Sequence, residues 1–401
     1  MKTLRILALS LLLLGGIFVL IGALRSSVWR VEVHTDIEAP AAVIHPYIAN
    51  FKHWSAWAGW NSNNDPQARF VFSGPESGVG AQCTWSGPQL GSGRAEITRA
   101  DPEAGVWLDE AINSKSLNAK SSLTYTTVSP GTTRVTWRQE GRLAGVMAGW
   151  LRGGVEAQLS AQFTQSLVAL GAQISATQKR FSLLPKIEAH GSVRSVTVDR
   201  DWSTKVRLEE ISTQRRIGVG ILSGMQGQVT YVEGGVWIAM PQGGRVVDLV
   251  TAEPEGEATL MITAKVDRWR ASAIPKEFRL KELESVIAER VKAAGLPVDR
   301  PIPFRLRCGV INAVWHVDDG TQAIKATGKP GEPAQLVQTR PEVKADIVGF
   351  YSPKGWGVIT PVDGAIYAHI VVPSERVSGH FDSGMIQPMA VLLLPDVDPP
   401  N

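Results

Sequence analysis

The chain has 401 residues, enough for two or three domains that each bury a core of their own. Its 41 basic residues nearly balance its 38 acidic residues, so no basic surface for nucleic acid is expected and nucleic-acid binding is disfavoured. The two cysteines, Cys83 and Cys308, lie too far apart in sequence for a CxxC metal site, and two are too few for a disulfide framework.

The first stretch, residues 6–24, reads ILALSLLLLGGIFVLIGAL and carries no charge. As a helix it would span roughly the 30 Å hydrocarbon layer. The run is long for a signal peptide and no A-x-A cleavage site follows, so an uncleaved membrane anchor over residues 1–29 is favoured over a cleaved signal. Lys2, Arg5 and the terminal amine outweigh the positive charges after the run. We therefore expect a single-pass membrane protein with its soluble domains on the extracytoplasmic (periplasmic) face.

Residues 30–182 alternate short apolar strands with Gly and Pro, and end in a long amphipathic stretch. Trp54, Trp57 and Trp60 recur every third residue, which suits one side of a short helix or 3₁₀ turn. Between residues 155 and 180 the apolar side chains recur at helical spacing. The pattern predicts a long helix on a curved antiparallel sheet.

Several motifs in this region, IEAPAAVIHPYIANFKHWSAWAGW, GVGAQCTW and TTRVTW, resemble the SRPBCC or START-like helix-grip domains of the polyketide cyclase/dehydrase type. The resemblance implies a cavity between sheet and helix that holds a hydrophobic small molecule or lipid. Tryptophans either line such a cavity or pack in its core and rim. The candidates for the cavity are Trp54, Trp57, Trp60, Trp85 and Trp137.

The second half, residues 187–398, follows the break at Pro185 and reads as hairpins, one helix and further strands. The helix is predicted within residues 276–297, with Leu280, Leu283, Ile287 and Val291 buried. Residues 318–341 read as a loop. The mixture predicts an α+β domain.

A strand and its return carry the best candidate for a metal site. In IYAHIVVP the period of two places Tyr367 and His369 on one face, and His380 follows after a polar turn. Two histidines on a strand and its return, with a phenol beside them, could hold a cation. The alternative is that both histidines are satisfied core or surface residues.

Three pieces of the second half occur in the order of the α-acetolactate decarboxylase family and are similar to its motifs: RIGVGILSGMQGQVTYVEGGVW, ELESVI with FRLRCGVINAV, and DIVGFYSPKGWGVITPVDGAIYAHIVVPSERVSGHFD. The resemblance implies zinc on three histidines and decarboxylation of 2-acetolactate to acetoin. It matches His369 and His380 to two zinc ligands and puts Tyr367 in place of the first.

The resemblance also implies changes in the groups that would work beside the metal. Gln228 stands where the family has a glutamate, and an amide cannot shuttle a proton. The substrate-gripping arginine corresponds to Arg307 or to the neighbourhood of His316. His316 or His190 could complete a metal set.

Three functions remain open for this half. The first is binding of a small ligand by a domain whose zinc site is altered. The second is a metal-dependent carboxy-lyase acting on 2-acetolactate or a related hydroxy-keto acid, with zinc on Tyr367, His369 and His380. The third is an acetolactate decarboxylase with weak catalysis. We take ligand binding as the leading hypothesis, and leave a homodimer open.

Overall fold

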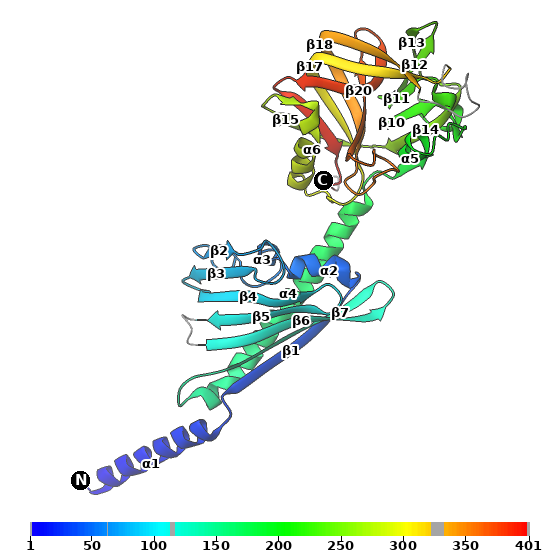
Figure 1. The fold of residues 1–401 in the computed structure, drawn as a ribbon. Helices are drawn as coiled ribbons and strands as arrows, with labels where there is room; N and C mark the ends of the chain where they lie inside the picture. The colour runs from blue at the N-terminus through cyan, green and yellow to red at the C-terminus, as the bar shows by residue number, and fades with distance from the viewer. Residues whose placement is uncertain (1, 62, 113–116, 322–332, 399–401) are drawn as a thin grey trace. The chain divides into compact units, whose positions relative to one another are not determined.

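The computed structural model describes residues 2–61, 63–112, 117–321 and 333–398. The chain divides into two compact units, Met1–Lys179 and Arg180–Asn401 (Figure 1). Strands hold 47% of the chain and helices 23%, and each unit is built on antiparallel sheet.

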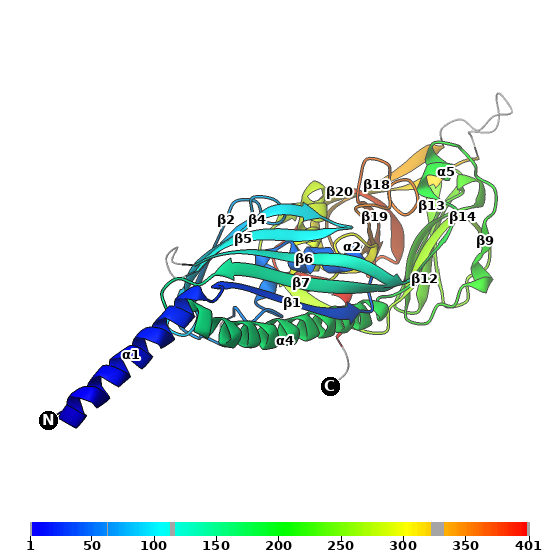
Figure 2. The ribbon, with the colours of Figure 1, turned by 90° about the horizontal axis from the view of Figure 1, so that it is seen from below.

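The first unit is one seven-stranded antiparallel sheet in the order β1-β7-β6-β5-β4-β3-β2. The helix α4 runs along one face of this sheet (Figure 2). This agrees in part with the predicted helix-grip arrangement. The bounds are β1 (Val28–Ile37), α2 (Ala41–Ile48), α3 (Phe51–Trp54), β2 (Arg69–Ser73), β3 (Gln82–Gly87), β4 (Gly91–Asp101), β5 (Gly105–Ile112), β6 (Leu117–Ser129), β7 (Thr132–Arg142) and α4 (Ala148–Ser182).

The core of this unit forms because apolar residues alternate along the strands and recur at helical spacing in α4. Phe163, Leu167, Leu170 and Ile174 of α4 are all buried against the sheet. Trp137 of β7 stacks on Phe163, with ring centroids 4.0 Å apart. The long helix therefore shares one core with the sheet.

The predicted membrane anchor over residues 1–29 is wrong, and so is the predicted single-pass membrane protein. Residues 2–24 do form a helix, α1 (Lys2–Leu24). However, no helix among the described residues combines the length and the apolar character that a membrane span needs.

The second unit contains two seven-stranded sheets, with strand orders β13-β12-β11-β10-β14-β8 (β9 also pairs with β14) and β15-β21-β17-β18-β19-β20-β16. In the second sheet β17 also pairs with β20, so strands β17 to β20 close on themselves. The bounds are β8 (Ile187–His190), α5 (Val193–Thr197), β9 (Val206–Arg207), β10 (Arg216–Leu222), β11 (Gln228–Val232), β12 (Gly235–Gln242), β13 (Arg245–Thr251), β14 (Glu257–Lys265), β15 (Trp269–Ile274), β16 (Phe278–Arg279), α6 (Leu283–Ala293), β17 (Ile302–Asp319), β18 (Ala334–Tyr351), β19 (Ile366–Val372), β20 (Val377–Ile386) and β21 (Ala390–Pro395).

Two predictions for this unit need correction. The predicted helix begins later, because Leu280 lies in a 3₁₀ turn and α6 starts at Leu283; Gly295, with φ of 62°, follows its end. The predicted loop over residues 318–341 is in large part strand. β17 continues to Asp319 and β18 begins at Ala334, while residues 322–332 lie outside the described part.

The register of the closed strands brings three histidines together. His380 of β20 lies directly opposite His369 of β19 and also opposite His316 of β17. Facing residues in antiparallel strands have Cβ atoms about 5 Å apart. The inner face of the other sheet packs against this region, since Ile221 and Leu260 share a core with Tyr367.

Candidate functional site

The second unit has a pocket of about 890 Å³ between its two sheets, which we call the histidine pocket. Its polar wall comes from four strands: Gln228 of β11, His316 of β17, Tyr367 of β19 and His380 of β20. Arg200 and Asp363 also line the pocket. The apolar part of the lining is formed by Val193, Val196, Trp202, Ile221, Met225 and Leu260.

The structure brings together the three residues predicted as metal ligands. The ring centroids of Tyr367 and His369 are 5.6 Å apart, those of Tyr367 and His380 are 5.3 Å apart, and those of the two histidines are 5.8 Å apart. His316, predicted as a candidate for the arginine position, joins them with its centroid 4.9 Å from that of His380.

His369 lies behind the pocket wall and is fully buried. Its Nδ1 is 2.8 Å from the Thr230 hydroxyl oxygen, while its Nε2 has no hydrogen-bond partner among the described residues. Burial, helped by the charges of His380 and His316, lowers the pKa of His369 well below its usual value. His369 is therefore a neutral imidazole.

The neighbours of His369 are neutral as well. Burial and the charge of His316 lower the pKa of His380 to about 4. Burial, with the negative charge of Asp318, raises the pKa of Tyr367. The Tyr367 hydroxyl has no partner among the described residues. This corner of the site thus offers two uncharged rings and a protonated phenol.

A charged pair lies beside this neutral corner. His316 Nδ1 is 2.7 and 2.9 Å from the two carboxylate oxygens of Asp382. Burial alone would lower the pKa of His316, but the hydrogen bond and charge of Asp382 and the charge of Asp318 outweigh it, and the pKa is raised. Its Nε2 faces Gln335 at 3.2 Å. Asp382 therefore favours the protonated form of His316.

Gln228 connects the two parts of the polar wall. Its side-chain nitrogen donates to Asp318 Oδ2 at 2.7 Å. Its own carbonyl oxygen Oε1 is buried and has no partner among the described residues. Burial raises the pKa of Asp318, against the attraction of His316 and the hydrogen bond from Gln228.

The donor set does not fit the zinc site that the resemblance implies. A catalytic zinc site usually has three protein ligands that are deprotonated or neutral imidazoles. Of the three predicted ligands, His369 and His380 are imidazoles, whereas Tyr367 is a phenol that must lose its proton before it can bind a metal. Among the described residues, no three His, Cys, Asp or Glu side chains gather as a metal group.

The other predicted site residues are placed as follows. Gln228 lies on the wall of the histidine pocket, but Arg307 does not; it pairs with Glu233 near the other end of β17. His190 lies on β8, opposite Met261. The five predicted cavity tryptophans of the first unit form one cluster of contacting rings: Trp54, Trp57, Trp60, Trp85 and Trp137.

Sequence reasoning missed Asp318, Asp382 and Thr230. The period of two could have found the first two, since Asp318 follows His316, and Asp382 follows His380, by two residues on the same strand. Nothing in the sequence pairs Thr230 with His369, because their strands belong to different sheets.

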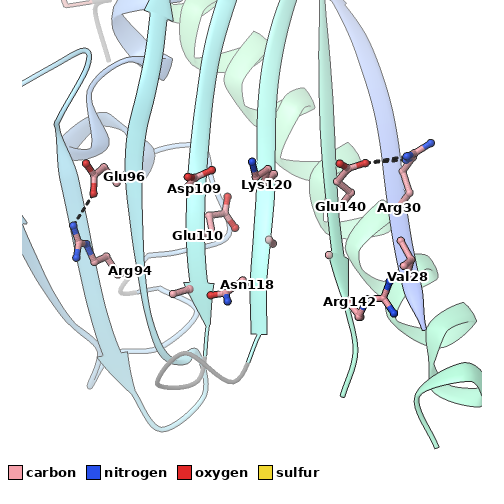
Figure 3. Close-up of a pocket in the computed structure, with 13 residues that line it drawn as sticks. Val28, Arg30, Arg94, Glu96, Asp109, Glu110, Asn118, Lys120, Glu140 and Arg142 are labelled. Atoms are coloured by element: carbon pink, nitrogen blue, oxygen red, sulfur yellow. Dashed lines mark hydrogen bonds and ion pairs between the residues drawn. The ribbon is translucent and has the colours of Figure 1, made fainter. Parts of the chain in front are cut away.

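The first unit has its own hollow, of about 600 Å³, on the charged face of the sheet (Figure 3). Arg30 pairs with Glu140 at 3.0 Å and Arg94 with Glu96 at 2.6 Å. All four side chains are more than a third exposed. These pairs are typical of a solvated sheet face and contribute little to stability.

Known proteins resemble each half of the chain. Residues 28–175 match the family described as polyketide cyclase / dehydrase and lipid transport. No curated protein matches the chain. An acetolactate decarboxylase structure from Bacillus subtilis subspecies spizizenii is 14% identical, with a TM-score of 0.42, over 52% of this chain and 86% of its own.

Two further solved structures are similar. A Staphylococcus aureus protein of unknown function, described as similar to alpha-acetolactate decarboxylase, is 13% identical over 52% of this chain and 85% of its own, with a TM-score of 0.38. A norcoclaurine synthase from Thalictrum flavum is 10% identical over 38% of this chain and 96% of its own, with a TM-score of 0.30. Both resemblances expected from the sequence are confirmed.

Proposed function

We propose that the second unit binds a small hydroxy-keto acid or a related polar molecule in the histidine pocket. One observation carries the proposal: the buried wall residues Gln228 and Tyr367 each leave a polar atom without a partner among the described residues. Gln228 Oε1 accepts hydrogen bonds, and the Tyr367 hydroxyl can donate one. Because unpaired buried polar groups are costly, a ligand that pairs with both is favoured.

The charges of the pocket fit the same kind of ligand. A hydroxyl group of the ligand would donate to Gln228, and a carbonyl oxygen would accept from Tyr367. His316, whose protonated form is favoured by Asp382, would attract a carboxylate. The apolar wall, with Trp202 and Met225, would cover the carbon skeleton.

The experiment compares binding with turnover on the full chain. Isothermal titration calorimetry with 2-acetolactate should give saturable binding, and Tyr367→Phe should weaken it about two- to tenfold, the range for one lost hydrogen bond. Tyr351→Phe is the matched control, because Tyr351 is a buried tyrosine of the same unit that does not line the pocket. Equal effects of both variants, or no saturable binding, would contradict the proposal.

The same sample separates binding from metal-assisted catalysis. Elemental analysis by mass spectrometry measures bound zinc, and an acetoin assay measures decarboxylation. We expect neither stoichiometric zinc nor acetoin. Stoichiometric zinc, with acetoin formation that His380→Ala abolishes, would establish the carboxy-lyase instead.

For the first unit we propose a hydrophobic small molecule or lipid as ligand, supported by the family match over residues 28–175. Trp60 is the least buried member of the tryptophan cluster and stacks on Trp85 at 5.0 Å. A hydrophobic ligand should therefore quench the tryptophan fluorescence of the wild-type chain more than that of Trp60→Leu. Equal quenching would contradict a ligand at this cluster.

A further inference from the structure

A second pocket of the same unit, of about 680 Å³, is lined by Arg215, Arg216, Arg305 and Arg307, and we call it the arginine pocket. The rest of its lining combines two carboxylates, Glu233 and Asp267, with an apolar part. The apolar part is formed by Ile217, Val266, Trp269 and Leu393. His316 follows Arg305 by eleven positions on β17, roughly 36 Å along the strand at 3.3 Å per residue. None of its lining residues lines the histidine pocket.

Arg305 is built into this pocket as a buried cation. Only 5% of the residue is exposed. Its Nε and Nη2 donate to the two carboxylate oxygens of Asp346 at 2.9 and 2.8 Å, which fixes the plane of the guanidinium. The remaining nitrogen, Nη1, donates to Glu233.

A single carboxylate from the chain already sits between two of these arginines. Glu233 Oε1 accepts from Arg305 and also from Arg307 Nη2, the latter at 2.6 Å. Glu233 occupies the two-residue hairpin between β11 and β12 in a left-handed conformation, with φ of 53°. Its side chain is 60% exposed. The Arg307 side chain is 53% exposed as well, so the ion pair between Glu233 and Arg307 is weak and can be exchanged for another carboxylate.

Another arginine of the pocket, Arg216, uses only part of its hydrogen-bonding capacity. Arg216 donates from Nη1 to Glu188 at 2.6 Å and to Thr263 at 2.7 Å. Its Nε is buried and has no hydrogen-bond partner among the residues that the structure describes. A second acceptor group in the pocket would therefore find a donor that is otherwise unsatisfied.

We propose that the arginine pocket binds a small organic carboxylate with an apolar or aromatic body. Its carboxylate replaces that of Glu233 on Arg305 and Arg307, and its body lies against Trp269 and the apolar wall. Arginine forks recognise planar carboxylates through paired hydrogen bonds. Glu233 is then an internal competitor that any such ligand must displace.

The test uses benzoate as the probe, titrated calorimetrically into the full chain. Removing the competitor with Glu233→Gln should tighten benzoate binding by about tenfold, and Arg307→Ala should weaken it by a similar factor. Arg207→Ala is the matched control, because Arg207 is a comparably exposed arginine of the same unit, paired with Glu209 outside the pocket. Arg307 is chosen over Arg305, whose removal would leave Asp346 buried without its partner.

Two comparisons make the result decisive. Acetate, which lacks the aromatic body, should bind more weakly than benzoate to Glu233→Gln. His316→Ala should leave benzoate binding unchanged, so failure of the histidine-pocket proposal would not affect this test. The proposal is overturned if Glu233→Gln shows no saturable benzoate binding, or if His316→Ala abolishes binding while Arg307→Ala does not.

Discussion

The Asp382 carboxylate raises the pKa of His316 and thereby affects the charge of the histidine pocket. Asp382 holds both of its oxygens within 2.9 Å of His316 Nδ1 and offsets the effect of burial. Asp382→Asn keeps the size and shape of the side chain and removes its negative charge. We expect the pKa of His316 to fall below its wild-type value, because burial then acts against the cation with less opposition. Titration of the imidazole Cε1 proton by NMR measures it.

The ion pair of His316 and Asp382 also determines how the stability of the fold changes with pH. A raised folded-state pKa means that the ion pair stabilises the fold below the ordinary histidine pKa of 6.5, and that this stabilisation is lost as pH rises through the folded value. Asp382→Asn should therefore lower stability more at pH 6 than at pH 9. Glu375→Gln, which changes a surface pair with Arg340, is the control; an equal pH dependence in both variants would contradict the assignment.

The grouping of Tyr367, His369 and His380 could be predicted from the sequence, whereas the pairing of His316 with Asp382 could not. Alternation along β19 and the polar turn before His380 were sufficient to bring Tyr367, His369 and His380 together. The partner of His316 depends on the pairing of β17 with β20, which are more than fifty residues apart in sequence. Local periodicity contains no information about that register.

Strands β17 and β18 carry a buried ion pair whose loss should be costly. The Arg305 side chain is 6% exposed and that of Asp346 13%. Asp346→Ala leaves a buried guanidinium without its bidentate partner, and we expect a loss of about 3–5 kcal/mol in the free energy of unfolding. Urea denaturation measures it.

A surface pair between β18 and the turn that follows β19 provides the control. Glu375→Ala breaks the ion pair with Arg340, whose side chain is 36% exposed, and should cost less than about 1 kcal/mol. The double variant Arg305→Met/Asp346→Leu should recover much of the stability lost in Asp346→Ala, because it buries no unpaired charge. A loss in Asp346→Ala no larger than in Glu375→Ala would show that Arg305 finds another partner.

The same two strands show where prediction from the sequence failed. Residues 334–341 contain glutamine, threonine, one arginine and a proline, and their sequence predicts a loop. They nevertheless form the first part of β18, because β17 offers them a long pairing edge. Tertiary pairing overrides local propensity here. The apolar stripe of the long helix α4, in contrast, was predictable because it depends only on spacing within one element.

The first unit buries a carboxyl group with a strongly raised pKa inside its sheet, so the stability of this unit should depend on pH. Glu110 of β5 is 3% exposed and accepts from Gln139 Nε2 at 2.5 Å. Burial raises its pKa to about 8, although hydrogen bonds from Ser121 and Gln139 act in the opposite direction. The folded unit therefore binds this proton more tightly than the unfolded chain, and its stability falls as pH rises from about 4.5 to about 8.

Glu110→Gln should remove most of this dependence of the unit's stability on pH. The amide cannot ionise, and its nitrogen can donate to Gln139 Oε1, which has no partner among the described residues. At pH 9 we expect the first unit of the variant to be more stable than wild type by on the order of 1–3 kcal/mol, with little difference at pH 5. Scanning calorimetry of the full chain measures it, and the transition that Asp346→Ala shifts identifies the second unit. Glu140→Gln, an exposed change on the same sheet, should leave the slope in place; an unchanged slope in Glu110→Gln would mean that Glu110 is ionised in the folded protein.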